Sequence, residues 1–316
     1  MAALNDSADE LLVIYGPTAT GKTAASIELA QRLGGEVVSA DSVQVYRGFD
    51  IGSAKPSLEE RRGVVHHLID VVDPDENLDA QRYADLADVA IQDIQSRGRL
   101  PIVAGGTGLW LRALLRGLVE LPAVDLEVRE RWESQVREWG PERSHAELDK
   151  VDPITAKSVH QNDALRIVRA LEVLEQTGRP LGELRQEHAL GAPRYRAAIY
   201  VLAMDRTSHD ERIAFRTNAM FEAGWEDEVA LLRERWGDSV RPFGSVGYRE
   251  VLAAQRGELP RDELHDAVRR STRVYARRQR TWAGSIPNVR ATLRAEDLMR
   301  DEPFALKNTV KPAPAE

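Results

Sequence analysis

The 316-residue chain contains no cysteine. This absence excludes a disulfide framework, a thiolate metal site, an iron–sulfur cluster and a cysteine nucleophile. No apolar run approaches the roughly 18 residues that a membrane helix requires. The first ten residues have neither the basic nor the apolar region of a secretory signal. We therefore expect a cytoplasmic protein that does not enter a membrane.

The chain also lacks an excess of positive charge, since 43 Lys and Arg stand against 51 Asp and Glu. A net charge of −8 argues weakly against a nucleic-acid partner, although local clusters decide that question better than totals. With 42% hydrophobic and 30% charged residues, the composition is that of a folded chain and not of a disordered one. Its length is about twice that of a typical domain.

Short apolar runs alternate with amphipathic segments over much of the chain. The runs at 11–15, 36–40, 67–72, 100–104 and 197–204 predict buried strands, and the segments 22–33, 78–96, 208–236 and 261–282 predict helices. This alternation predicts an α/β fold with a parallel sheet covered on both faces. Residues 125–190 show almost no strand signal, so we expect a helical insertion over 116–196 within an α/β core formed by 1–115 and 197–316. Residues beyond 301 are expected to be loose.

The clearest motif is Gly16-x-x-x-x-Gly21-Lys22-Thr23, which follows a predicted strand and opens a predicted helix. In such a P-loop, glycines let successive backbone N–H groups turn inward on a phosphate chain. The lysine supplies a charge, and the threonine hydroxyl can ligate Mg²⁺. The motif predicts phosphate binding and a P-loop NTPase-like core. It leaves open whether the ligand is a nucleoside triphosphate or another diphosphate.

Two polar residues follow other predicted strands, at the sheet edge where α/β proteins bind ligands. Asp41 comes directly after one strand and could act as a general base or a metal ligand, or equally as a turn or N-cap aspartate. Thr107 follows Gly105-Gly106, where glycines permit the backbone to approach a ligand. An ordinary turn is the alternative there. The adjacent pair His66-His67 is interpreted as structural, because no ligand-spaced acid or histidine accompanies it.

An arginine-rich segment lies near the end of the predicted helical region. Residues 269–280 hold six arginines and no acid. Four of them, Arg269, Arg273, Arg277 and Arg280, fall within an arc of about 80° on an α-helix. Because guanidinium groups suit phosphate recognition, this stripe predicts contact with nucleic acid or polyphosphate, with a solvated face as the alternative.

The assembled motifs resemble the tRNA dimethylallyltransferase (tRNA isopentenyltransferase) family. The resemblance is carried in order by the P-loop, by residues 39–56 (SADSVQVYRGFDIGSAKP), by 67–70 (HLID), by 105–108 (GGTG), by Asn162-Asp163 with Arg166, by 169–173 (RALEV), by 246–248 (VGY) and by 278–282 (RQRTW). It spans about residues 11–282. No single match is specific, but their order along the chain is.

The resemblance implies transfer of a dimethylallyl group from dimethylallyl diphosphate to the exocyclic amine of the adenosine 3′-adjacent to the anticodon in tRNA. It implies catalytic roles for Asp41 as the base, and for Thr107 and Lys22 in stabilising the leaving diphosphate. The diphosphate is expected to bind Gly16, Pro17, Thr18, Ala19, Thr20, Gly21, Lys22 and Thr23, with Arg212 and Arg216 as further clamps. Thr23 would place Mg²⁺. The tRNA is expected to contact Asp41, Ser42, Val43, Gln44, Arg129, Arg166, Arg169, Gly247, Tyr248, Arg249, Arg277, Arg278 and Gln279, with the helical insertion also contacting the anticodon stem-loop.

The chain departs from the family pattern after Trp282, where Ala283-Gly284 replace a bulky residue and an arginine. A bacterial-type enzyme is the closer match, because the zinc finger of eukaryotic relatives needs cysteine. We expect a monomer. Two enzymatic alternatives remain, namely an adenylate isopentenyltransferase, which would take a free nucleotide, and a P-loop small-molecule kinase. A non-catalytic RNA-binding module is a third class, but it has no need of a P-loop.

Overall fold

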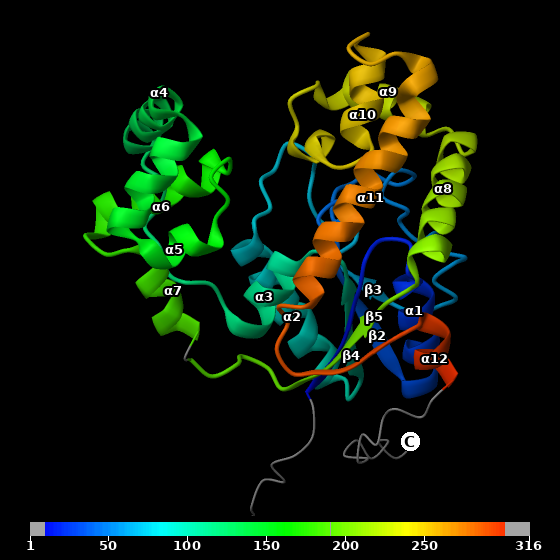
Figure 1. Cartoon of the computed structure of the whole chain (residues 1–316). Helices are drawn as coiled ribbons and strands as arrows, with labels where there is room; N and C mark the ends of the chain where they lie inside the picture. Colours follow the sequence, from blue (N-terminus) through cyan, green and yellow to red (C-terminus); the bar gives the residue numbers. More distant parts are fainter. Residues whose placement is uncertain (1–9, 190, 301–316) are drawn as a thin grey trace, which may run out of the picture. The chain divides into compact units, whose positions relative to one another are not determined.

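The computed structural model describes residues 10–189 and 191–300, so the prediction for residues beyond 301 lies outside the described residues. These divide into two compact units, one formed by residues 10–115 and 194–300 and the other by residues 116–189 and 191–193. Each unit has its own buried apolar cluster. Figure 1 shows the sheet and most of the helices in the larger unit and a group of helices in the smaller one.

The larger unit is built on a parallel sheet of six strands in the described chain, in the order β3-β2-β4-β1-β5-β6. The strands are β1 (Leu11–Tyr15), β2 (Gly35–Ala40), β3 (His66–His67), β4 (Leu100–Gly105), β5 (Ala197–Leu202) and β6 (Val289–Leu293). The central strands are buried on both faces, as parallel strands between helices must be. The predicted α/β class with a P-loop-like sheet is therefore confirmed.

Helices cover the two faces of the sheet. On one face, α1 (Lys22–Leu33) and α12 (Ala295–Arg300) pack with β-strand residues such as Leu12 and Tyr200. Helix α2 (Ala80–Ser96) packs against β2 and β4, and α3 (Gly108–Arg116) follows β4. The rings of Tyr83 on α2 and Trp110 on α3 stack with centroids 4.3 Å apart.

A further group of helices belongs to the same unit. It comprises α8 (Arg206–Glu222), α9 (Trp225–Trp236), α10 (Tyr248–Gln255) and α11 (Leu264–Ala283), with short 3₁₀ turns at Arg241–Gly244 and Arg261–Glu263. The long helix α11 packs along α8 (Figure 1). Gly224, with φ 91°, separates α8 from α9, so the single helical region predicted over 208–236 is two helices.

The strand predicted over 67–72 is wrong in extent. Leu68 and Asp70 take left-handed backbone conformations, with φ of 60° and 57°, which end the extended chain after His67. Val72 then pairs with Tyr46 through an isolated bridge. The prediction also missed β6 and α12, which are short and carry few buried residues.

The smaller unit is helical, as predicted for 125–190. It contains α4 (Leu126–Val151), α5 (Pro153–Ser158), α6 (Ala164–Thr177) and α7 (Leu181–Ala189). Helix α4 is kinked at Gly140, which has φ 77° and precedes Pro141, a residue that cannot continue the helical hydrogen bonds. The buried faces of α4, α6 and α7 share one apolar cluster that includes Leu148, Leu171 and Leu181.

Candidate active site

The phosphate-binding loop connects β1 to α1, as the motif predicts. Ala19 and Gly21 have φ of 63° and 92°, so the chain turns twice into left-handed conformations within the loop. Gly21 is the N-cap of α1 and contributes no side-chain acceptor. The first N–H groups of the helix are therefore left without intrahelical or capping partners, which is the arrangement that binds anions.

Lys22 lies against this loop, and its Nζ donates to the carbonyl oxygen of Pro17 at 2.8 Å. Burial lowers the pKa of Lys22 to about 8, an effect opposed by the charge of Asp41 and reinforced by that of Arg216. A partly desolvated ammonium group beside free N–H donors gains strongly from an incoming anion. The loop thus combines a positive charge with oriented backbone donors.

Helix α8 brings two arginines to the same loop, one turn apart. Arg216 Nη1 donates to Thr18 Oγ1 at 3.4 Å, and burial lowers the pKa of Arg216 while Asp41 opposes that shift. Arg212 is exposed, and its Nη2 lies 4.0 Å from the point that a Cβ on Gly21 would occupy. Both predicted diphosphate clamps therefore reach the P-loop.

Asp41 follows β2 and is half-buried. Its Oδ1 accepts hydrogen bonds from the backbone N–H of Val43 at 2.9 Å and of Gln44 at 3.3 Å. The carboxylate thus caps its own turn through Oδ1, and Oδ2 takes no part in these two hydrogen bonds. The turn interpretation of Asp41 is confirmed, and the same turn fixes the orientation of a side chain that lines a cavity, where its role as a base stays a prediction.

Thr107 lies beside this turn. Its Oγ1 accepts from the N–H of Ser42 at 3.2 Å, and its own N–H donates to the carbonyl of Ala40 at 3.2 Å. The approach requires glycine, because a Cβ at Gly105 would lie 2.2 Å from the Ala40 carbonyl oxygen. The ends of β2 and β4 therefore hold Asp41 and Thr107 in one cluster.

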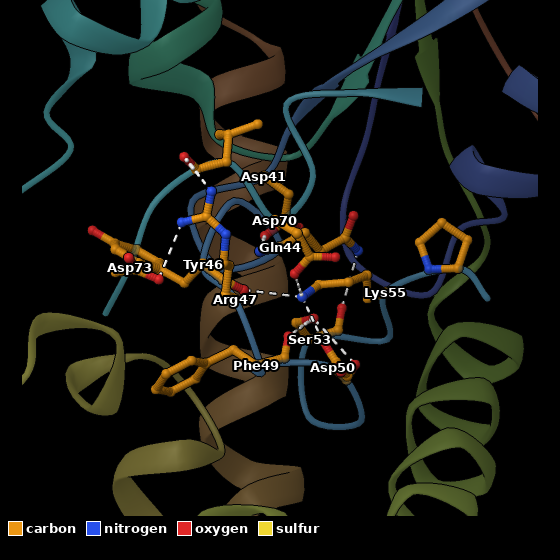
Figure 2. A network of polar contacts seen from close by, with 12 residues as sticks. Asp41, Gln44, Tyr46, Arg47, Phe49, Asp50, Ser53, Lys55, Asp70 and Asp73 are labelled. Atoms are coloured by element: carbon orange, nitrogen blue, oxygen red, sulfur yellow. Dashed lines mark hydrogen bonds and ion pairs between the residues drawn. The ribbon is translucent and has the colours of Figure 1, made fainter. Parts of the chain in front are cut away.

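The segment after Asp41 forms a compact polar network, shown in Figure 2. The side-chain amide of Gln44 donates to the carbonyls of Ser53 at 3.1 Å and Ala54 at 3.2 Å. Lys55 Nζ donates to the Tyr46 carbonyl at 2.9 Å and to Asp70 Oδ1 at 2.5 Å. These bonds hold the chain that carries the predicted base-contacting residues in one conformation.

A cavity of about 310 Å³ opens beside Asp41. Its polar end includes Thr18, Asp41, Ser42 and Arg216, and its walls include apolar side chains such as those of Val43, Ile213, Met220, Trp225 and Val246. Arg249, Tyr275 and Arg278 also line it. Small-molecule sites have this size and this combination of apolar walls with a few polar groups.

One wall of the cavity is held by the buried indole of Trp225. A Cβ at Gly52 would lie 2.0 Å from its Nε1, and a Cβ at Gly247 would lie 2.2 Å from its Cη2. Gly247 also has φ 89°, so it begins α10 in a conformation that other residues rarely adopt. The indole is therefore clamped between the main chains of two separate loops.

The candidate tRNA contacts of the larger unit separate into two groups. Ser42 and Val43 line the cavity, as do exposed Arg249 and Arg278, while Arg277 is exposed on α11. Tyr248 and Gln279 are buried instead: the Tyr248 hydroxyl donates to Glu228 Oε1 at 2.6 Å, and the Gln279 amide bonds to protein groups. Tyr248 and Gln279 thus have internal partners, and their contact with RNA stays a prediction.

Three members of the predicted arginine stripe on α11 also contact α8, and contact of the stripe with nucleic acid stays a prediction. Arg269 donates to Asn218 Oδ1 at 2.5 Å, Arg273 lies 3.5 Å from Asp210, and Arg280 contacts His209, so three of its four members face α8. Arg277 and Arg278 are exposed, and within residues 10–189 and 191–300 neither side chain makes a hydrogen bond or ion pair.

The insertion arginines have internal roles as well. Glu172 is fully buried, and it accepts hydrogen bonds from Arg129 Nη2 at 2.9 Å and from Arg169 Nη1. Both cations thereby neutralise a buried carboxylate, so their predicted RNA contact competes with a structural one. Arg166 is exposed on α6 and pairs with Asp163 at 2.7 Å.

The two adjacent histidines have internal partners. His67 Nε2 lies 2.7 Å from buried Glu36, and His66 Nδ1 lies 3.0 Å from the Val64 carbonyl. In the part of the chain that the structure describes, no group of three or more His, Cys, Asp or Glu could hold a metal ion. None of the helices described is long and apolar enough to cross a membrane.

Two functional candidates were missed from the sequence. Tyr275 lies on the inward face of α11 and lines the cavity, and burial raises its pKa well above the ordinary value while Thr107 and Gln279 oppose the rise. His209 is buried on α8 and contacts the P-loop at Thr18. Helical spacing alone marks Tyr275 as opposite to Arg277, but nothing local in the sequence places His209 beside the loop.

A P-loop after the interior strand β1 of a parallel sheet, with a carboxylate and a cavity beside it, is the arrangement of an enzyme with a P-loop fold. The model of the IPP transferase family matches residues 44–285. The chain therefore belongs to this family.

Individual proteins similar to this chain belong to the same family. The chain is 49% identical to a tRNA dimethylallyltransferase of Sorangium cellulosum over 86% of this chain and 87% of the relative. It is also 49% identical to one of Anaeromyxobacter dehalogenans, over 86% and 91%. Among solved structures, a tRNA isopentenylpyrophosphate transferase from Bacillus halodurans is similar at TM-score 0.65 and 38% identity, over 90% of this chain and 89% of that one. A eukaryotic dimethylallyltransferase acting on tRNA is similar at TM-score 0.74 and 30% identity, over 92% and 75%.

Proposed function

We propose that this protein transfers a dimethylallyl group from dimethylallyl diphosphate to the exocyclic amine of the adenosine 3′-adjacent to the anticodon of tRNA. The products are N(6)-(dimethylallyl)adenosine and diphosphate. One observation carries the proposal: a single cavity is lined by Thr18 of the P-loop, by the carboxylate of Asp41 and by apolar walls. Family membership supports the same reaction.

The proposed chemistry divides between the two ends of this cavity. At the P-loop, Lys22, Arg212, Arg216 and the backbone N–H groups would receive the diphosphate, whose negative charge grows as the allylic carbon–oxygen bond breaks. The side chain of Thr107 would add a hydroxyl donor. The apolar walls fit the hydrocarbon group and shield the allylic carbon from water.

Asp41 would act on the adenosine. The exocyclic amine is a poor nucleophile because its lone pair is delocalised into the ring. As the nitrogen–carbon bond forms, Asp41 Oδ2 would accept the amine proton, while Oδ1 keeps the turn through the N–H groups of Val43 and Gln44. To reach this site the base must leave the stacked anticodon loop, as in other enzymes that modify bases.

We propose Mg²⁺ as the cofactor, which the Thr23 hydroxyl would help to hold beside the diphosphate. The residues fit this role, because Thr23 is exposed directly after Lys22 and lines a small cavity with Ser26 and Asp41. Mg²⁺ bound in this way keeps several waters and needs few protein ligands. When bound, it supplies positive charge to the leaving group.

Arg249, Arg277 and Arg278 are the proposed phosphate contacts on the larger unit, because they are exposed and two of them line the cavity. Arg166 is the exposed candidate on the helical insertion, which we propose to contact the anticodon stem-loop. We propose that a monomer carries out the reaction, in the cytoplasm where tRNA is found.

The test is transfer of label from dimethylallyl diphosphate to unmodified tRNA with adenosine after the anticodon, with AMP and ATP as competing substrates. Label on tRNA alone is the expected result. Label on AMP would make the protein an adenylate isopentenyltransferase. Consumption of ATP without label transfer would make it a kinase, and either outcome would refute the proposal.

A further inference from the structure

The carboxylate of Glu228, on α9, receives hydrogen bonds from three successive backbone N–H groups. Its Oε2 accepts from Asp50 at 3.0 Å and from Ile51 at 2.6 Å, and its Oε1 accepts from Gly52 at 3.3 Å. Oε1 also accepts from the Tyr248 hydroxyl. Successive N–H groups in a turn form a concave site for an anion. Here a side chain from a distant helix supplies that anion.

Tyr248 adds a third element to this junction, because it is the first residue of α10. Burial and the charge of Glu228 raise the pKa of Tyr248 well above the ordinary value, so its hydroxyl keeps the hydrogen that it donates. Its ring also packs edge-on against Trp225 of α9, with ring centroids 5.4 Å apart. The start of α10 and the turn at 50–52 are therefore held by one carboxylate.

Trp225 limits how closely this turn can approach α9. It precedes Glu228 by three residues, so the two side chains lie on the same face of the helix. A Cβ at Gly52 would lie 2.0 Å from Trp225 Nε1, so the main chain is already at closest approach. The turn cannot move toward α9 because of the indole, and it cannot move away without losing the bonds to Glu228. The helix thus fixes the position of the turn.

The turn is joined in its own loop to the segment that carries Asp41. The carbonyls of Ser53 and Ala54, directly after the turn, accept from the side-chain amide of Gln44. The backbone N–H of Gln44 in turn donates to Asp41 Oδ1. Figure 2 shows Asp41, Gln44 and Ser53 within this network. A displacement of the turn would therefore move Gln44 and change the orientation of the Asp41 carboxylate.

The contacts of Lys55 join loop to loop, in contrast to those of Glu228. Lys55 contacts Asp50 and Asp70, and all three residues lie outside the helices. Glu228 belongs to α9, a helix that is fixed in the larger unit by buried residues such as Val229. Glu228 therefore anchors to a helix the loop that ends at the candidate base.

We propose that Glu228 is a positioning residue for the transfer reaction. The inference rests on the proposed function, in which Asp41 takes the amine proton. Glu228 holds the turn at 50–52 against α9, and the turn keeps Gln44 where its N–H group orients Asp41 toward the cavity. Glu228 acts through Gln44 and does not itself meet the reacting atoms.

The test is single-turnover transfer of label to tRNA by Glu228→Gln, with both substrates saturating. Glutamine keeps the length of the side chain and one acceptor oxygen, but it loses the charge and sets an NH₂ group among the donors that Glu228 accepts from. Because a misplacement of about 1 Å can cost about 10²-fold in rate, we expect transfer to slow by about 10- to 100-fold. Affinities for inorganic diphosphate with Mg²⁺ and for the anticodon stem-loop should stay close to those of the unaltered protein, because the P-loop and the exposed Arg277 and Arg278 belong to other elements. A merely structural role would lower the stability in urea and leave the rate of the folded variant unchanged.

Glu234→Gln is the matched control, because it makes the same change of charge at an exposed position of the same helix. It should transfer label at the normal rate. Glu228→Asp keeps the charge and withdraws the carboxylate by one methylene group, so it should fold and show a smaller decrease. A normal rate in folded Glu228→Gln or Glu228→Asp, or an equal decrease in Glu234→Gln, would overturn the proposal.

A double-variant cycle tests the path through Gln44. Gln44→Ala removes the amide that joins the turn to Asp41, so adding Glu228→Gln to this variant should slow transfer little further. If the two decreases instead multiply in full, Glu228 does not act through Gln44 and the proposal is refuted.

The label-transfer assay on the unaltered protein separates this inference from the proposed function. Transfer to tRNA with a normal rate in Glu228→Gln would leave the proposed function intact and refute the positioning role. Transfer only to AMP, slowed by Glu228→Gln, would retain the positioning role, because AMP presents the same amine to Asp41, and would refute tRNA as the acceptor. Consumption of ATP without label transfer would refute both.

Discussion

Replacing Asp41 with asparagine tests the proposed base with little change in shape. Asn Oδ1 can still accept from the N–H groups of Val43 and Gln44, which Asp41 Oδ1 holds at 2.9 and 3.3 Å, so the turn after β2 should persist. The amide, however, cannot take the amine proton. General-base catalysis contributes about 10²–10⁴-fold, so we expect the transfer rate to fall by at least 10²-fold, or about 2.7 kcal/mol in activation free energy.

The assay is single-turnover transfer of label to tRNA with enzyme in excess, which isolates the chemical step from product release. Affinity for the anticodon stem-loop, measured separately, should change little, because the exposed arginines are untouched. Asp41→Asn also removes a charge that raises the pKa of Lys22. Diphosphate affinity should therefore weaken at a lower pH than in the unaltered protein. A transfer rate within a few-fold of normal would refute the role of Asp41 as the base.

Three further predictions concern charge. The pKa of Lys22 in the protein without ligand is about 8, so Lys22 loses its proton as the pH rises through 8 and affinity for inorganic diphosphate should fall above that pH. Calorimetry measures this affinity. In Lys22→Arg, which stays charged, the affinity should change with pH only as the diphosphate itself gains or loses protons. Arg129→Ala leaves buried Glu172 with fewer hydrogen-bond donors and should lower the free energy of unfolding, measured by urea denaturation, by about 1–3 kcal/mol. The decrease should be smaller when Glu172 is first replaced by glutamine. Equal decreases in the two cases would contradict the pairing of Arg129 with Glu172. In the double variant Arg277→Ala, Arg278→Ala, the slope of log affinity for the stem-loop against log salt concentration should become shallower by about 0.9 for each RNA phosphate that the variant no longer neutralises. An unchanged slope would show that these two arginines do not contact RNA.

The sequence predicts the elements that local rules determine. The run before Gly16 and the helix after Gly21 are specified by burial, glycine conformation and the position of Lys22, and the structure has them where they were expected. The predicted strand at 67–72 failed for a local reason that its apolar character hides, namely the left-handed backbone at Leu68 and Asp70.

The site was less predictable, because its partners are far apart in the chain. Gln279 looks like one more polar residue in a basic helix, yet it bonds to Thr18, 261 residues away. Arg129 looks free for a phosphate until Glu172, 43 residues on, is found buried beside it. In both cases burial decides the role, and burial depends on which elements pack together.

The glycines that clamp Trp225 have a consequence for substrate selection. Gly52 and Gly247 bring main chain directly against the indole of Trp225. A smaller residue at either position therefore cannot widen the cavity on this side, because glycine has no side chain to lose. A larger residue would push the indole into the cavity. The width available to an isoprenoid chain is thus adjustable mainly at the opposite walls, where Val43 and Met220 contribute ordinary side chains. A member of this family that accepted a longer prenyl donor would have to make its room there.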